Sequence, residues 1–207
     1  MKDNDRTSTR VVGTEAQARQ IADAAARLAA RRQRDALPHR INTPRLVLRA
    51  PIRGDVPDLV ALANNKAIAA KLSRLPSPYT RADGVAFVEI FAQRADQRPY
   101  AITLGDRMIG VVGLTLSSDE PAELGYWLGE PYWGKGYMSE AVKALLTAAF
   151  ETKLFPELQA RALADNAGSL RVLEKSGFVR TGEEIEGVGT HAGKALVLLR
   201  AEPPRWL

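Results

Sequence analysis

The stretch from residue 122 to residue 142, AELGYWLGEPYWGKGYMSEAV, contains the local signals around which the rest of the fold can be arranged. Residues 122–128 predict a β-strand, and the glycine-bracketed Lys135 leads from it into a helix with apolar residues at helical spacing, Val142, Leu145, Leu146 and Ala149. A lysine between two glycines at the start of a helix has three interpretations: a plain turn, a nucleotide P-loop, or a cradle for a pyrophosphate group.

The spacing excludes the P-loop. That motif reads G-x-x-x-x-G-K-[ST], whereas Lys135 lies between Gly134 and Gly136 and no Ser or Thr follows it directly. Glycines lack a Cβ atom, so the N–H groups from Lys135 to Ser139 can converge on an anion at the positive end of the helix dipole. With a strand predicted before it and a helix after it, the loop favours the pyrophosphate cradle, with Lys135 as an assisting surface charge.

Working outward, the other signals predict an α/β protein with a mixed, mostly antiparallel sheet and helices that cross over it. A Gly-Asp turn at residues 105–106 predicts a hairpin, Asp55 and Asn166 are helix caps, and residues 73–79 are a loop. The predicted strands are residues 45–49, 100–104, 108–116, 122–128, 158–163, 178–185 and 195–200, and the predicted helices are residues 55–64, 80–91, 137–149 and 166–175.

Composition limits the chemistry. Of the 207 residues, 45% are hydrophobic and 26% are charged, as in ordinary globular proteins. There is no cysteine, so disulfides, zinc-thiolate sites and a cysteine nucleophile are excluded, and two histidines leave little material for a metal site, so no metal is expected. No apolar run approaches the ~20 residues of a membrane helix and the N-terminus lacks a signal peptide's apolar segment, so we expect no membrane association and a cytoplasmic protein.

The N-terminal part differs from the rest. Residues 1–40 hold nine Lys/Arg against five Asp/Glu, a net +4 of the chain's +5. A capping box at residues 14–17 and a mostly alanine stripe up to Ala29 predict a helix that ends before Pro38. We therefore expect a basic helical extension, 1–40, and one domain, 41–207. An Arg-rich solvated helix is favoured over nucleic-acid binding, with contact to a ribosome or a second subunit left open.

Four blocks in this order resemble the GNAT acetyltransferases, in the branch of the ribosomal-protein N-terminal acetyltransferases RimJ and RimL. They are residues 43–49 (TPRLVLR), 122–128 (AELGYWL), 132–137 (YWGKGY) and 166–178, which begins NAGS and ends EKSGF. The family's loop pattern, Q/R-x-x-G-x-G/A, falls on residues 133–138, where Trp133 replaces the first residue and Met138 replaces a small last residue.

The resemblance implies the GNAT fold and acetyl-CoA as co-substrate, bound where the strands at 122–128 and 158–163 splay apart. It implies direct attack by a primary amine, with Glu123 as the base and Ser169 beside the coenzyme sulfur, since the position where many members carry a tyrosine is Leu173. Glu130 is a second candidate base. The implied coenzyme-binding residues are Trp127, Leu128, Trp133, Gly134, Lys135, Gly136, Tyr137, Met138, Ser139 and Asn166.

The acceptor stays open at this stage. The resemblance implies an N-acetyltransferase that acts on a protein N-terminal amine or on a small-molecule amine such as a polyamine, amino sugar or amino-acid analogue. An acyl-CoA-binding module without turnover is the alternative from a different class, favoured by Leu173 and Met138.

Overall fold

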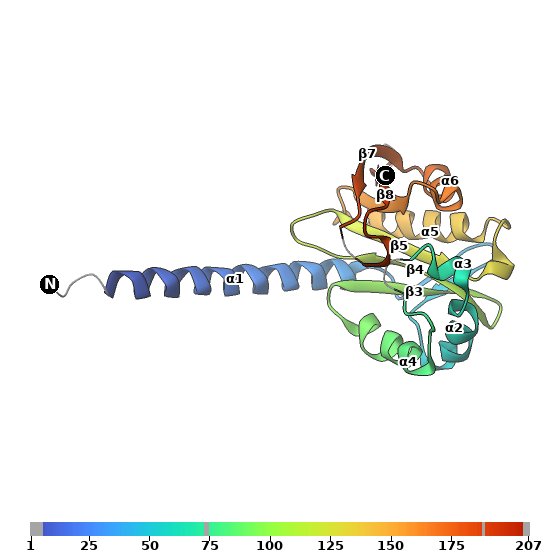
Figure 1. The fold of residues 1–207 in the computed structure, drawn as a ribbon, viewed down its shortest axis with the longest axis horizontal. Helices are drawn as coiled ribbons and strands as arrows, with labels where there is room; N and C mark the ends of the chain where they lie inside the picture. Colours follow the sequence, from blue (N-terminus) through green and yellow to red (C-terminus); the bar gives the residue numbers. More distant parts are fainter. Residues whose placement is uncertain (1–5, 73–74, 188, 205–207) are drawn as a thin grey trace.

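The computed structural model describes residues 6–72, 75–187 and 189–204. A single twisted sheet forms the centre of the body, helices cover both of its faces, and a long N-terminal helix extends away from it (Figure 1). Among the helices of these described residues, none is long and apolar enough to cross a membrane.

The sheet has eight strands in the order β1-β2-β3-β4-β5-β6-β8-β7. Neighbouring strands are antiparallel except β5 and β6, which are parallel, so the predicted mixed, mostly antiparallel α/β fold is confirmed. The strands are β1 Arg40–Asn42, β2 Val47–Arg49, β3 Gln97–Leu104, β4 Arg107–Thr115, β5 Ala122–Leu128, β6 Leu158–Leu163, β7 Val179–Ile185 and β8 Ala195–Ala201.

Six α-helices and four 3-10 turns connect the strands of the described chain. The helices are α1 Arg6–Ala36, α2 Val56–Ala63, α3 Lys66–Ala69, α4 Arg81–Glu89, α5 Tyr137–Glu151 and α6 Ala167–Lys175. The 3-10 turns are η1 Arg53–Asp55, η2 Phe91–Gln93, η3 Glu130–Tyr132 and η4 Gly189–His191. Helices α5 and α6 lie on one face of the sheet and α2 and α4 on the other (Figure 1).

The alternation of side chains along each strand divides the core into two layers. On β3, Tyr100 and Ile102 point into the larger layer under α5 and α6, while Ala101 between them points into the smaller layer under α2 and α4. Seven of the eight β3 residues are buried, because helices cover both faces of this central strand. The sheet therefore separates two surfaces that a ligand could approach independently.

Several boundaries differ from the sequence predictions. The strand expected at residues 45–49 begins at Val47, and it pairs with β1, which sequence reasoning missed. Helix α3 at residues 66–69 was also missed, in the stretch between the helix predicted to end at residue 64 and the loop predicted at residues 73–79; residues 73 and 74 of that loop lie outside the described residues. Three or four residues are too short to display a helical or strand period, so neither element leaves a readable pattern.

One predicted helix start is wrong, and a second is right in position but lacks the expected capping bond, because Asp55 is the N-cap residue of α2. Helix α1 begins at Arg6, so Thr14 lies inside it and not at its cap. Asp55 has helical backbone angles because η1 runs directly into α2, and its side chain makes no cap bond to α2. The Asp55 carboxylate instead accepts the Ile52 N–H at 2.8 Å and pairs with the Arg49 guanidinium at 2.7 Å.

The C-terminal end of α1 is fastened to the sheet. Ala30 and Leu37 are buried in the larger core layer. The carbonyl groups that end the helix are satisfied from β3: the buried Arg98 donates to the Leu37 oxygen at 3.1 Å, and the Tyr100 hydroxyl donates to the Pro38 oxygen at 2.6 Å. A guanidinium at this end is also favoured by the helix dipole.

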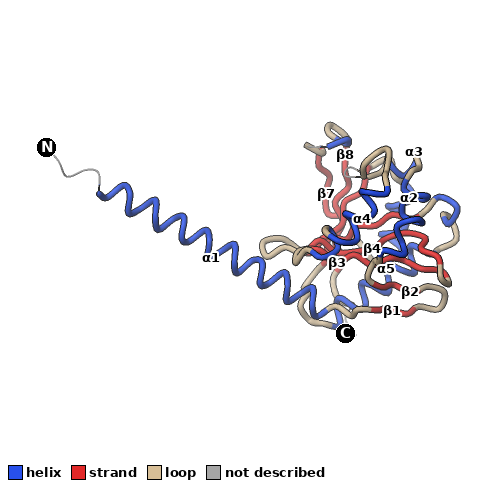
Figure 2. Tube along the Cα trace, turned by 90° about the horizontal axis from the view of Figure 1, so that it is seen from below, coloured by secondary structure: helices blue, strands red, loops and turns tan. Residues whose placement is uncertain are grey.

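The rest of α1 extends into solvent, as Figures 1 and 2 show from two directions. On this part of the helix, Ile21 and Leu28 are 65% and 69% exposed. The sheet begins at Arg40, one residue before the boundary predicted at residue 41. The extension is thus anchored through the last two turns of α1, while residues 15–29 are largely exposed.

These differences in burial predict that the same Leu→Ala substitution costs much more stability at a buried site than at an exposed one. Leu145 on α5 is fully buried, so Leu145→Ala should lower the free energy of unfolding by about 2–5 kcal/mol through lost apolar contact and a cavity. Leu28→Ala removes the same atoms from an exposed site and should change it by less than about 0.5 kcal/mol. Urea unfolding followed by circular dichroism measures both; equal losses would contradict the arrangement of the core.

Candidate active site

The two parallel strands β5 and β6 pair along only part of their length. Their register runs from Ala122 opposite Leu158 to Leu124 opposite Ala160 and then stops. The remaining residues, 125–128 of β5 and 161–163 of β6, face each other without pairing, while β6 stays paired to β8 on its other side. We call this unpaired region the β5–β6 opening; it lies where a splayed pair of strands was expected.

The backbone direction of β5 decides which groups face the opening. The Gly129 N–H donates to the Ile109 oxygen of the β4 side, and a Cβ atom at Gly110 would lie 2.5 Å from the Trp127 carbonyl oxygen. Alternate residues of a ladder point to opposite neighbours, so the backbone of Trp127 belongs to the β4 ladder. The backbone groups of Tyr126 and Leu128 are the ones that face β6.

The glycine-lysine loop forms an open cradle at the start of α5. Gly134 and Gly136 have φ angles of +73° and +78°, which L side chains rarely adopt. A Cβ atom at Gly134 would have no heavy atom within 4 Å, and one at Gly136 would meet only the Arg45 Nη2 atom, at 3.5 Å. No side chain caps α5, so the N–H groups of its first turn are available to an anion.

Met138 does not obstruct this cradle. Its side chain is 6% exposed and packs in the larger core layer with Ala141 and Val142. The long side chain therefore points into the protein, and the phosphate-facing position of Met138 is its backbone. These residues fit a pyrophosphate group such as that of coenzyme A.

A cation that sequence reasoning left unassigned lies beside the cradle. The Arg45 Nη1 atom donates to the Lys135 carbonyl oxygen at 3.0 Å, and its guanidinium lies 4.6 Å from the centre of the Tyr137 ring. Its Nε atom pairs with Glu140 at 2.6 Å, and the Thr43 hydroxyl donates to the same carboxylate at 2.6 Å. Arg45 and Thr43 lie in residues 43–49, the first sequence block that resembles the family, and that block was the sequence signal that could have pointed to them.

These contacts determine the pKa of Glu140 and the charged groups that lie beside the cradle. Desolvation alone would raise the pKa of Glu140, but hydrogen bonds from Thr43 and Arg45 outweigh it and lower the pKa below its ordinary value. Lys135 turns back, with its Nζ atom donating to the Pro131 oxygen at 3.0 Å and lying 6.0 Å from the Tyr132 ring centre. The guanidinium directly beside the cradle is therefore that of Arg45, which is paired with Glu140.

On the α6 side of the β5–β6 opening, the predicted site residues Asn166 and Ser169 lie close to Tyr126 of β5. Asn166 is the N-cap of α6, and its Oδ1 atom accepts the Ser169 N–H at 3.3 Å, so Asn166 caps the helix as predicted. The Tyr126 hydroxyl lies 2.8 Å from the Ser169 Oγ atom and 3.1 Å from the Ser169 carbonyl oxygen. Burial raises the pKa of Tyr126 to about 12. Leu173 is 1% exposed, so that position serves packing here.

Glu123 lies on the opposite face of the sheet from Tyr126. It belongs to the paired part of β5, and its carboxylate accepts from the Arg161 guanidinium at 2.9 Å. Arg161 also pairs with Glu184 at 3.3 Å. Desolvation lowers the pKa of Arg161, but hydrogen bonds and charge from the two carboxylates outweigh it and raise the pKa, so the guanidinium stays charged. Glu130, the second candidate base, is held by the Asn65 side-chain amide at the start of α3.

The aromatic residues near the opening have distinct positions. Trp127 packs against the smaller core layer under α2 and α4. Trp133 is 43% exposed, and its Nε1 atom donates to the Leu128 carbonyl oxygen at 2.7 Å, which links the cradle loop to the end of β5. Leu128 thus keeps its N–H group as the donor directed at the opening.

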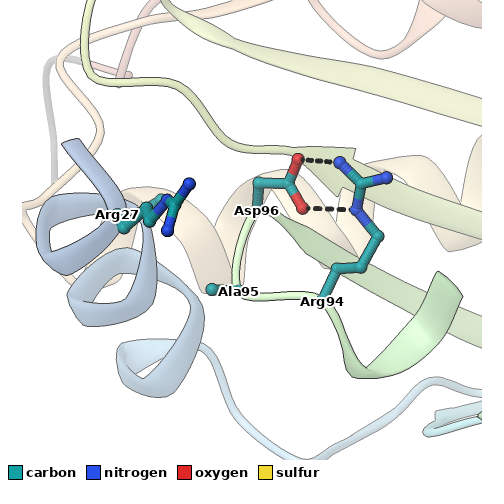
Figure 3. Close-up of a pocket in the computed structure, with 5 residues that line it drawn as sticks. Arg27, Arg94, Ala95 and Asp96 are labelled. Atoms are coloured by element: carbon teal, nitrogen blue, oxygen red, sulfur yellow. Dashed lines mark hydrogen bonds and ion pairs between the residues drawn. The ribbon is translucent and has the colours of Figure 1, made fainter. Parts of the chain in front are cut away.

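A separate hollow of about 290 Å³ lies at the root of α1, lined by Arg27 and Ala30 of the helix and by residues 94–96 (Figure 3). The Arg94 guanidinium there is paired with Asp96 at 2.7 and 2.9 Å. The hollow is smaller than ordinary ligand pockets of about 300–1,000 Å³. None of the site residues predicted from the sequence lines it.

Comparison with known proteins agrees with this geometry. The family described as the acetyltransferase (GNAT) domain matches residues 45–179, so the chain belongs to the GNAT acetyltransferase family. Among curated relatives, the Bacillus subtilis (strain 168) protein named as a probable N-acetyltransferase, YjcK, is 39% identical over 80 residues, covering 37% of this chain and 44% of its own length.

The ribosomal-protein-serine acetyltransferase of Escherichia coli (strain K12) is 29% identical over 92 residues, which cover 44% of this chain and 51% of that protein. The chain therefore spans about half the length of the curated relatives it matches. Among solved structures, RimL, a ribosomal L7/L12 alpha-N-protein acetyltransferase in complex with coenzyme A, superposes with a TM-score of 0.71, covering 79% of this chain and 97% of that one. At 23% identity this likeness shows the fold.

The open cradle predicts a glycine-specific effect on coenzyme binding. Gly136→Val places a branched side chain at positive φ over the N–H groups, and should weaken coenzyme A binding at least about tenfold while lowering the free energy of unfolding by about 1–2 kcal/mol. Gly105→Val, at φ +59° in the β3–β4 turn, carries the same backbone penalty far from the cradle and should bind normally. Calorimetric titration measures the affinities; unchanged binding by Gly136→Val would refute the cradle.

Proposed function

We propose that this protein is an acetyl-CoA-dependent N-acetyltransferase that acts on a primary amine. The observation that carries the proposal is the two-sided β5–β6 opening. An anion cradle and the Tyr126–Ser169 pair lie on the α5/α6 face, and a carboxylate, Glu123, lies on the other. Such an arrangement lets the coenzyme and the acceptor enter from opposite faces and meet where the strands separate.

On the coenzyme side, the proposed contacts come mainly from the backbone. The N–H groups of residues 135–139 and the Arg45 guanidinium would hold the pyrophosphate, and Asn166 would contact the pantetheine arm through its Nδ2 atom, because its Oδ1 atom is used in the helix cap. Trp133 holds the loop to β5. This assignment includes Gly134, Lys135, Gly136, Tyr137, Met138 and Ser139 through their backbone.

The reaction requires a neutral amine, a stabilised tetrahedral intermediate and a group that stabilises the negative charge on the leaving sulfur. The amine nitrogen forms a bond to the acetyl carbon, the carbon–sulfur bond breaks, its electron pair goes to sulfur, and one proton leaves the nitrogen. An α-amino group has a pKa of about 8, so a modest base such as Glu123, directly or through water, suffices. The Leu128 N–H group, on the strand edge that faces β6, would stabilise the oxyanion.

The proposed acceptor is a protein N-terminal amine. Support comes from the similarity to the ribosomal-protein-serine acetyltransferase and from the fold shared with RimL. None of the proposed site residues comes from residues 1–40, so the extension is proposed as an appendage outside the catalytic unit. Its exposed surface is open to a ribosome or a second copy of the chain.

An amine panel tests the reaction and its acceptor. Thiol release from acetyl-CoA should rise with peptides that carry a free N-terminal amine and should stay at background with the same peptides acetylated. Release only with a polyamine, amino sugar or amino-acid analogue would replace the protein acceptor with a small molecule. Coenzyme binding without release on any amine would make the chain an acyl-CoA-binding module and refute the proposal.

Replacement of the base gives a second test. Glu123→Gln should reduce kcat/KM by about 10²-fold, most strongly at low pH where the amine is mostly protonated, and should leave coenzyme affinity unchanged. The loss should shrink as rising pH deprotonates the amine without help. Glu183→Gln, the same change at an exposed position of β7, is the control. A pH–rate profile equal to that of the wild type would remove Glu123 from the mechanism.

A further inference from the structure

The Tyr126 hydroxyl is the one side-chain group of β5 that the structure joins to α6, across the β5–β6 opening of the described chain. Tyr126 comes from the unpaired part of β5, and Ser169 comes from the first turn of α6, which follows β6. Their oxygen atoms are 2.8 Å apart, a full hydrogen bond. A hydroxyl pair is therefore built into the place where the coenzyme sulfur is proposed to lie.

The geometry allows two arrangements of the protons. A phenol has one proton to donate, and Tyr126 lies within reach of two acceptors on Ser169, the carbonyl oxygen at 3.1 Å and the Oγ atom at 2.8 Å. If the phenol donates to the carbonyl oxygen, the Ser169 proton can turn to the phenol. If it donates to Oγ, the Ser169 proton points elsewhere. A negative charge in the opening favours the second arrangement, because it attracts that proton.

We propose that Tyr126 is a positioning residue that turns the Ser169 hydroxyl toward the leaving sulfur, so that the pair stabilises a thiolate by hydrogen bonding. This inference rests on the proposed function, since it assigns a role at the same site. It supplies from β5 and the start of α6 what Leu173, buried in the core, has no polar group to supply. It makes Tyr126 a functional residue and not merely part of an aromatic lining.

The pair acts as a hydrogen-bond donor and not as an acid. Burial raises the pKa of Tyr126 to about 12, so its hydroxyl keeps its proton throughout the neutral range. A thiol has a pKa of about 8.5, well below that of the phenol, so full proton transfer to the sulfur would be unfavourable. The sulfur therefore leaves as a thiolate, and the proton released by the amine reaches it afterwards through solvent.

The experiment needs no acceptor amine. Coenzyme A is bound to the protein, and the ultraviolet absorbance of its thiolate is followed against pH. In the wild type the thiol pKa should fall by about one unit or more below that of free coenzyme A titrated in the same buffer, the effect of one hydrogen bond to a charged group. Ser169→Ala should restore the ordinary value, Tyr126→Phe should restore most of it, and the double variant should match Ser169→Ala.

The control removes another buried tyrosine hydroxyl. Tyr100→Phe loses the hydrogen bond to Pro38 at the root of α1, so it should lower stability without moving the thiol pKa. A Tyr126 hydroxyl that only links β5 to α6 would instead change the melting temperature and coenzyme affinity and leave the thiol pKa of all variants alike. Tyr126→Phe keeps the packed ring, and Ser169→Ala gives an independent variant if it folds poorly.

The outcomes separate this inference from the proposed function. Bound coenzyme with an ordinary thiol pKa in the wild type, or a lowered value that both variants retain, overturns the role of the pair and leaves acetyl transfer standing. No coenzyme binding by the wild type overturns both. A lowered thiol pKa that depends on Tyr126 and Ser169, together with about tenfold lower kcat in each variant at unchanged KM for acetyl-CoA, confirms the inference.

Discussion

The site depends on one constraint: the hydrogen-bonded register between β5 and β6 stops after Leu124 and Ala160. A parallel pair cannot be left open without other support, because exposed backbone groups in the middle of a sheet are costly. Here β5 stays paired to β4 from Glu123 to Leu128, and β6 stays paired to β8 along its whole length. These outer ladders hold the two strands apart, so the unpaired groups can serve a ligand.

The surrounding packing places a layer of helices on each face of the sheet. The larger core layer fastens α5 and α6 to one face, and the smaller layer fastens α2 and α4 to the other. Because side chains alternate along β5, Tyr126 and Glu123 are delivered to different faces of the same strand. The proposed separation of coenzyme and acceptor chemistry thus follows from strand geometry.

Much of the fold could be predicted from local signals. The strands at 122–128 and 158–163, the hairpin at the Gly-Asp turn and the Asn166 cap were located correctly, because strand alternation, turn residues and cap residues act within a few positions. The short elements β1 and α3 were missed because three or four residues display neither a strand period nor a helical period. For the site, the cradle glycines could be selected from their spacing, whereas the roles of Arg45 and Tyr126 depend on contacts 90 and 43 residues away.

By itself the sequence determined the α/β class, the order of its main elements and a glycine loop whose conformation needs residues without a Cβ atom. Only the tertiary structure decided that Met138 turns into the core, that the backbone of Tyr126 and Leu128 and not of Trp127 faces the opening, and that Tyr126 meets Ser169. The reason is physical: backbone preferences are local, but the direction of a side chain or carbonyl group depends on which strand or helix lies opposite.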